Sequence, residues 1–100
     1  MLSGQVAVDA DGGVIAPGDV SAQTTVILEQ IRDLLAAHGA TLENVVHLRT
    51  FILDLGRLRE YGAARTAFFA GLIPPASTTV GVSALFLPGV ELEVEVLAGV

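Results

Sequence analysis

The sequence predicts an α+β fold in which two helices pack on one face of a single sheet. Two segments carry apolar residues at helical spacing, and both lie among segments rich in β-branched residues. The last of these segments, residues 90–98, alternates apolar and acidic side chains almost without exception. Strands interrupted by two helices are typical of α+β domains.

The N-terminal part of the chain predicts a strand, a reversal and the first helix. Residues 3–8 (SGQVAV) form the expected strand, and residues 9–13 (DADGG) are dense in turn formers. Asp19 is the expected start of the helix, and Gly39 is the left-handed residue that ends it. Between them, apolar residues recur at helical spacing at Ile27, Ile31, Leu34 and Leu35.

The remaining elements follow in the order strand, helix, strand, strand. Thr41 is expected to cap one turn that leads into a strand over residues 45–53. A second helix is expected over residues 58–70, because its apolar and aromatic residues are spaced by three and four. Residues 77–85 and 90–98 are the last two expected strands.

Period-two alternation predicts which side chains face the helices. In the last strand the side chains expected to face the helices are Val90, Leu92, Val94 and Val96, and those expected to face away are Glu91, Glu93 and Glu95. In the strand before it, Thr78, Val80, Val82 and Ala84 are expected to face the helices, and Ser77, Thr79, Gly81 and Ser83 to face away. In the middle strand the side chains expected to face the helices are Val46, Leu48, Thr50 and Ile52.

The composition is too apolar for one small domain in water. Apolar residues make up 52% of the 100 residues and charged residues 16%, against about 25% charged in typical domains. A chain of this size buries only about two-thirds of its extended surface. We therefore expect part of the apolar surplus, and part of the polar sheet face, to be buried between subunits. The alternative is that water covers the polar face, as in many antiparallel sheets.

Charge and residue usage exclude several classes of protein. The net charge is −6 and all five cations are Arg, so the electrostatic attraction that dominates nucleic-acid binding is missing. There is no Cys, which excludes disulfides and thiolate chemistry. The uncharged segment 66–90 is broken by Pro74-Pro75, which disfavours a membrane helix. No pair of His stands at metal-ligand spacing, and we expect a cytoplasmic protein without a metal.

Three runs, in order and at the right spacing, resemble the YjgF/RidA family of reactive intermediate deaminases. The runs are residues 3–14 (SGQVAVDADGGV), 18–55 (GDVSAQTT to FILDL) and 74–100 (PPASTTVGV to EVLAGV). The resemblance implies a chorismate-mutase-like fold with a mixed sheet, assembled as a homotrimer with small-molecule clefts between subunits. It also implies hydrolysis, without a cofactor, of enamine or imine intermediates that pyridoxal-phosphate enzymes release.

The resemblance also implies a set of site residues. Glu93 matches the Glu that orders the attacking water, and its neighbouring carboxylates suit acid–base chemistry. Substrate-binding positions are matched by Ser3, Gly4, Gln5 and Thr79, the last through its backbone. The alternative for Glu93 is a solvated or interface-bridging carboxylate, paired with Arg49 or Arg65.

The chain departs from the family pattern at the residue that binds the substrate. After Pro-Ala the family carries an Arg that grips a carboxylate, and this chain has Ser77 there. Arg65 is the candidate substitute for this anion clamp, and its alternative is a salt bridge at the rim of the cleft. The chain resembles subgroups that lack the Arg.

The N-terminus is a second departure. Family members usually have a strand before the Ser-Gly-Gln motif, whereas this chain starts two residues before Ser3. We expect one domain over residues 1–100, with the edge strand absent or the given start incomplete.

The sequence leaves two functions open. The first is a RidA-like homotrimer that binds a small metabolite between subunits, with weak or altered enamine/imine hydrolysis centred on Glu93. The second is a non-catalytic ligand-binding or interaction trimer. Ribonuclease activity, which has been attached to some relatives, is opposed by the net charge of −6.

Overall fold

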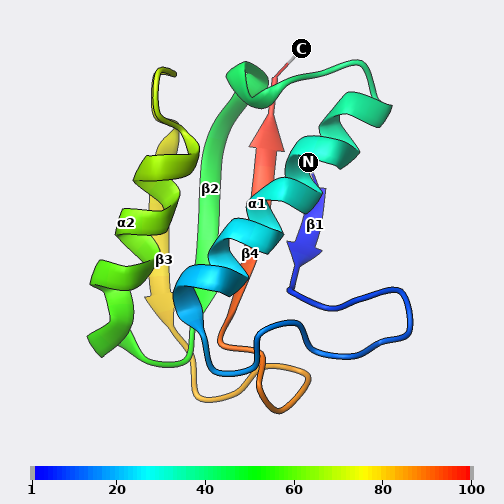
Figure 1. Cartoon of the computed structure of the whole chain (residues 1–100). Helices are drawn as coiled ribbons and strands as arrows, with labels where there is room; N and C mark the ends of the chain where they lie inside the picture. The colour runs from blue at the N-terminus through cyan, green and yellow to red at the C-terminus, as the bar shows by residue number, and fades with distance from the viewer. Residues whose placement is uncertain (1, 100) are drawn as a thin grey trace.

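A computed structural model describes residues 2–99, apart from the side chain of Ser3, and it confirms the α+β fold. A four-stranded sheet has the order β1-β4-β2-β3, and both helices cover one of its faces (Figure 1). β4 pairs antiparallel with β1 and β2, whereas β2 and β3 are parallel, so the sheet is mixed. The elements are β1 (Leu2–Gln5), α1 (Val20–Ala37), β2 (Val45–Ile52), α2 (Leu58–Phe68), β3 (Ala76–Gly81) and β4 (Leu92–Ala98).

The ends of α1 lie where the capping residues predict them. The Asp19 carboxylate accepts a hydrogen bond of 2.9 Å from the backbone N–H of Ala22. At the other end Gly39 has φ +75°, and the N–H of Ala40 donates to Leu35 O at 2.8 Å. Local side-chain chemistry therefore fixes the length of the helix that covers the sheet.

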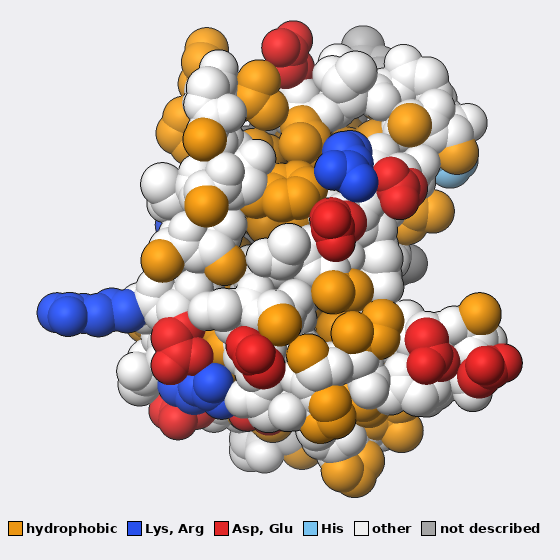
Figure 2. Space-filling view, viewed as in Figure 1, with side chains coloured by type: hydrophobic (Ala, Val, Ile, Leu, Met, Phe, Trp, Pro, Cys, Tyr) orange, Lys and Arg blue, Asp and Glu red, His pale blue; other side chains and the backbone are white. Residues whose placement is uncertain are grey.

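The core lies between the helices and β4, as the alternation predicts. Val90, Leu92, Val94 and Val96 are at most 1% exposed. Leu92, Val94 and Val96 pack in one cluster with apolar residues of α1 and β2, which include Ile27, Ile31, Leu48 and Ile52. Burying side chains of this size stabilises a fold by about 1.5–3 kcal/mol each. Figure 2 shows apolar side chains gathered between the two helices on the covered side of the sheet.

The predicted facing of β3 is wrong. In the parallel register Ser77 pairs with Leu48 and Thr79 with Thr50, so Ser77 and Thr79 lie on the helix side. Thr78 and Val80 therefore lie on the uncovered side, where the Thr78 hydroxyl is 2.9 Å from His47 Nε2. Val80 does not enter the core, since β3 is an edge strand and Val80 is 40% exposed.

The prediction that Val46 faces the helices is wrong, because β2 has a bulge at this residue. Val45 pairs with Ala98 and His47 with Leu97, so β2 has one residue more than β4 over this interval. Val45 is buried at this bulge, and Val46 is 50% exposed instead of facing the core. From Leu48 onward the alternation returns to the predicted facing, with Leu48, Thr50 and Ile52 buried.

Several predicted bounds also shift. β3 ends at Gly81 instead of residue 85, because its partner β2 ends at Ile52. β1 ends at Gln5, α2 at Phe68, and β4 begins at Leu92. In the described part of the chain, neither helix combines the length and apolar character that a membrane span requires.

Candidate functional site

The carboxylate of Glu93 lies against the backbone of β1 at Gly4. A Cβ atom added to Gly4 would overlap Oε1 of Glu93, so this position needs glycine for the carboxylate to lie where it does. The pairing of β1 with β4 is irregular between Leu2 and Gln5, where β1 has one extra residue. Bulges of this kind re-aim side chains next to functional sites.

Glu91, Glu93 and Glu95 differ in their ion pairs. In residues 2–99, Glu93 has no cation beside it. Glu91 accepts a hydrogen bond of 3.2 Å from Arg57, and Glu95 lies 3.5 Å from Nη1 of Arg49. Within residues 2–99, no Arg or His nitrogen lies within salt-bridge distance of the Glu93 carboxylate. The expected alternative pairing with Arg49 or Arg65 is therefore absent from the described chain.

Arg57 connects Gly18, Glu60 and Glu91, which belong to different segments of the chain. A hydrogen bond with Glu60, followed by the charges of Glu60 and Glu91, raises the pKa of Arg57. Its guanidinium also donates to the backbone oxygen of Gly18 at 2.7 Å. Arg57 is thus a structural cation that forms an ion pair with Glu91.

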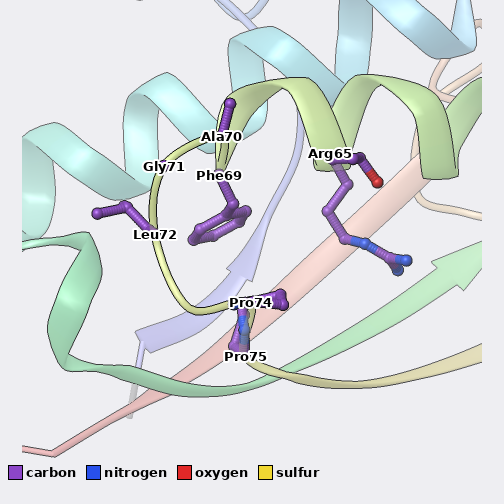
Figure 3. Close-up of a pocket in the computed structure, with 8 residues that line it drawn as sticks. Arg65, Phe69, Ala70, Gly71, Leu72, Pro74 and Pro75 are labelled. Atoms are coloured by element: carbon purple, nitrogen blue, oxygen red, sulfur yellow. The ribbon is translucent and has the colours of Figure 1, made fainter.

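A second group of predicted residues lies under α2 at the edge of the sheet. Nη1 of Arg65 donates to the Ser77 hydroxyl at 2.9 Å. A cavity of about 420 Å³ lies beside Arg65, and its lining also includes Phe69, Pro74 and Pro75. Figure 3 shows the Arg65 side chain leaving α2 toward the strands, on the same side of the helix as the Phe69 ring.

The backbone of β3, which begins directly after the cavity-lining Pro75, adds a polar edge to the sheet. In the described sheet β3 pairs with β2 alone, so the outward N–H and C=O groups of the strand have no strand partner. Thr79 lies on this edge strand and is half-buried. Such an edge can pair with a ligand or with another chain.

The predicted site residues therefore form two groups rather than one. Gly4 and Glu93 lie on β1 and β4, whereas Ser77 and Thr79 lie on β3, with β2 between them. Neighbouring strands are about 4.8 Å apart, so β4 and β3 are separated by about 10 Å. Because Glu93 and Ser77 also face opposite sides of the sheet, one small ligand within a protomer does not touch both groups.

The other two predicted binding residues, Ser3 and Gln5, belong to β1. Gln5 pairs with Val94 at the end of β1 and is half-buried. The side chain of Ser3 lies outside the described residues, so its predicted role stays a prediction. Across residues 2–99 no group of three or more His, Asp or Glu converges as a metal site would.

Sequence reasoning missed the residues that support Arg65. The guanidinium carbon of Arg65 lies 5.1 Å from the centroid of the Tyr61 ring, and Tyr61 shares a hydrogen bond with the buried Thr50 hydroxyl. The signal was present, since Tyr61, Arg65 and Phe69 are each four residues apart on one helix face. A cation within an aromatic stripe marks a helix face that is not purely core.

The fold and these two groups define a class of protein: small α+β domains with a carboxylate on an uncovered sheet face and a cation at the sheet edge. The family model described as Endoribonuclease L-PSP matches residues 1–100. The chain belongs to this family, the YjgF/RidA family. The assignment confirms the resemblance that the three sequence runs indicate.

Solved structures and curated relatives agree with this assignment. A Rid-family protein of unknown function, YyfB from Yersinia pestis, has a TM-score of 0.90 and 36% identity, covering 99% of this chain and 76% of that one. Rv2704 of Mycobacterium tuberculosis, of the YjgF/YER057c/UK114 family, has a TM-score of 0.83 and 35% identity, covering 98% and 75%. DfrA of Myxococcus xanthus is 36% identical over 97% of this chain and 72% of its own length.

The chain is shorter than the relatives it matches. The RutC family protein of Sulfurisphaera tokodaii is 31% identical over 84% of this chain, and the match spans 66% of that relative.

Proposed function

We propose that the protein is a homotrimer that binds a small metabolite between subunits and hydrolyses enamine or imine compounds weakly, without a cofactor. The observation that carries this proposal is the Glu93 carboxylate, which lies over Gly4 on the uncovered sheet face and has no cation partner in residues 2–99. A carboxylate in this condition is free to accept a proton from water. We further propose that residues 1–100 form one domain that works in the cytoplasm.

The separation of the two groups of site residues supports the trimer. A site that uses both Glu93 and Ser77 needs the uncovered face of one protomer beside the β3 edge of the next. Val80 and Leu97 are 40% and 47% exposed on the uncovered side, and subunit contact would bury them. Such burial also accounts for the apolar surplus in the composition.

The proposed reaction places Glu93 beside the attacking water. Glu93 accepts a proton from water as the water oxygen bonds to the C=N carbon and the C=N π electrons move to nitrogen, and Glu93 then gives this proton to the nitrogen. The carbinolamine then collapses to a carbonyl as ammonia leaves, with the second proton transferred from oxygen to nitrogen. The reaction consumes one water and needs no oxidant or metal.

The test is the turnover of 2-iminobutanoate, generated in situ by an amino-acid oxidase. We expect its loss to exceed the spontaneous rate, and Glu93→Gln to lower the catalysed rate by about 100-fold or more, because general acid–base catalysis contributes about 10²–10⁴-fold. Glu43→Gln, on the turn before β2, is the matched control and should leave the rate unchanged. Equal rates for the Glu93 variant and the parent would contradict the catalytic role.

One observation favours a second function, a trimer that binds without reacting. Ser77 stands where the family carries its substrate-binding Arg, and a hydroxyl does not form the bidentate pair that a guanidinium forms with a carboxylate. Ligand-induced thermal stabilisation without any product would identify this function. The same cleft and the same assembly serve both functions.

A further inference from the structure

Glu93 lies between two carboxylates that each hold an Arg. Glu91 precedes it by two residues and accepts from Arg57 at 3.2 Å, and Glu95 follows it by two residues and lies 3.5 Å from Nη1 of Arg49. In the described part of the chain, the carboxylate between them has no such partner. The pattern raises the question of what keeps the two cations away from Glu93.

Arg49 is placed so that its side chain can reach Glu93. On β2, Phe51 lies directly opposite Glu93, and Arg49 lies opposite Glu95 (Figure 1). Arg49 is thus a diagonal neighbour of Glu93, and such neighbours, with Cα atoms about 7–8 Å apart, are within reach of long side chains. Phe51 offers the carboxylate no polar hydrogen, and β1 lies against it at Gly4, which has no side chain. Arg49 is therefore the cation on the neighbouring strands that can pair with Glu93.

Glu95 is the group that holds Arg49 where it lies. Within residues 2–99, the contact with Glu95 is the one hydrogen bond of the Arg49 side chain. This side chain is 55% exposed, so packing restrains it little. A guanidinium with a single partner moves when that partner is lost, and a carboxylate within reach then attracts it.

Arg57, on the other flank, is held much more firmly. Besides Glu91, it donates to the Glu60 carboxylate at 2.9 Å and to the backbone oxygen of Gly18 at 2.7 Å. Two of these three partners remain when Glu91 is replaced. Arg57 therefore stays in place without Glu91, whereas Arg49 has no second partner to keep it in place without Glu95.

We infer that Glu95 is a positioning residue for Glu93, because it holds Arg49 beside itself and keeps that cation off the Glu93 carboxylate. The inference rests on the proposed function, in which Glu93 takes a proton from water. A carboxylate beside a guanidinium favours its charged form and takes up a proton less readily. Glu93 stays available as a base because its neighbour on the strand engages the nearby cation.

The experiment compares the parent with Glu95→Gln, Arg49→Gln, the double variant Glu95→Gln/Arg49→Gln, and Glu91→Gln. Crystal structures of the parent and of Glu95→Gln locate the Arg49 guanidinium, and the rate on 2-iminobutanoate is measured for all five proteins. Glu91→Gln is the matched control, because it removes the same charge at the same separation along the chain while Arg57 keeps two partners. Melting temperatures and sedimentation confirm that each variant folds and assembles as the parent does.

We expect the Arg49 guanidinium of Glu95→Gln to lie within salt-bridge distance of the Glu93 carboxylate. Its rate should fall by about 10-fold or more, because part of a general-base contribution of about 10²–10⁴-fold is lost. The double variant should regain most of the parent rate, since no cation is left to pair with Glu93. Arg49→Gln and Glu91→Gln should keep the parent rate. A merely structural role of Glu95 would leave the double variant as slow as the single one.

Different failures separate the inference from the proposed function. An Arg49 side chain that stays away from Glu93 in the Glu95→Gln structure overturns the inference, whatever the rates are. A double variant as slow as Glu95→Gln overturns it too, and so does an equal fall in rate for Glu91→Gln, which would assign the effect to lost negative charge. A parent without turnover contradicts the proposed function instead, and the position of Arg49 in the Glu95→Gln structure then still decides whether Glu95 keeps this cation off Glu93.

Discussion

Gly4 decides where the Glu93 carboxylate can lie, because any side chain at this position would occupy the same space. The atoms that an added side chain would overlap belong to the flexible end of the Glu93 side chain and not to the backbone. A larger residue at position 4 therefore moves the carboxylate without breaking the pairing of β1 with β4. A substitution of Gly4 can therefore displace the Glu93 carboxylate with little change in the free energy of unfolding.

Gly4→Ala should therefore reduce activity much more than stability. We expect a change of less than about 1 kcal/mol in the free energy of unfolding, since a Gly to Ala change also restricts the unfolded chain. The rate on 2-iminobutanoate should fall by about 100-fold, as for a displaced catalytic group. Urea unfolding and the rate assay measure the two effects.

Gly62→Ala is the matched control for this prediction. An added Cβ on Gly62 meets no atom within 4 Å, and the residue lies inside α2. This variant should gain about 0.5–1 kcal/mol of stability and keep its activity. An unchanged rate for Gly4→Ala would show that the position of Glu93 over β1 does not matter for turnover.

At the scale of elements, the sequence predicts those features that local chemistry determines. Asp19 and Gly39 set the ends of α1, and the alternation of β4 sets its buried face. The facing of β3 was not predictable in this way, because a parallel register with β2 is a long-range contact. The position of Arg65 over Ser77 depends on that register, so the sequence could name both residues but not their contact.

The buried side chain of Gln23 connects α1 to the loop before α1 and to the loop before β4. Its amide donates to Gly89 O at 2.7 Å and to Ala16 O at 3.1 Å, and its oxygen accepts from the N–H of Glu91 at 2.8 Å. Among residues 2–99, Ala16 is the non-glycine residue with positive φ, at 48°. Gln23 therefore holds a strained turn and the entry to β4 in place.

Gln23→Leu should destabilise the fold by about 2 kcal/mol or more, because it leaves buried backbone groups without partners. Urea unfolding measures the loss. Gln30→Leu on the same helix is the control, since Gln30 makes a single hydrogen bond of 3.4 Å to Val8 O. If the two variants lose equal stability, the Gln23 network contributes nothing beyond an ordinary surface contact.

At the scale of the whole molecule, the assembly is the proposal with the widest effect. Sedimentation equilibrium should give three times the chain mass of 10.3 kDa. Leu97→Asp adds a charge to the uncovered sheet face, near Glu93 and Glu95, and should dissociate the assembly by repulsion and by loss of apolar contact.

Ile73→Asp is the matched control for the assembly. Ile73 is 93% exposed in the loop between α2 and β3, so its replacement adds the same charge away from the uncovered face. We expect this variant to sediment as the parent does. A parent protein that sediments at the mass of one chain would contradict both the trimer and the shared cleft.

The edge location of β3 bears on how proteins of this fold diverge. Residue 77 is exposed and meets one side chain of α2, so its replacement disturbs little of the core. Glu93, by contrast, lies on an inner strand, and its carboxylate keeps its place only while position 4 is glycine. Evolution can therefore exchange residue 77 and its neighbours at the sheet edge at small cost, while the inner strand that carries Glu93 stays constant.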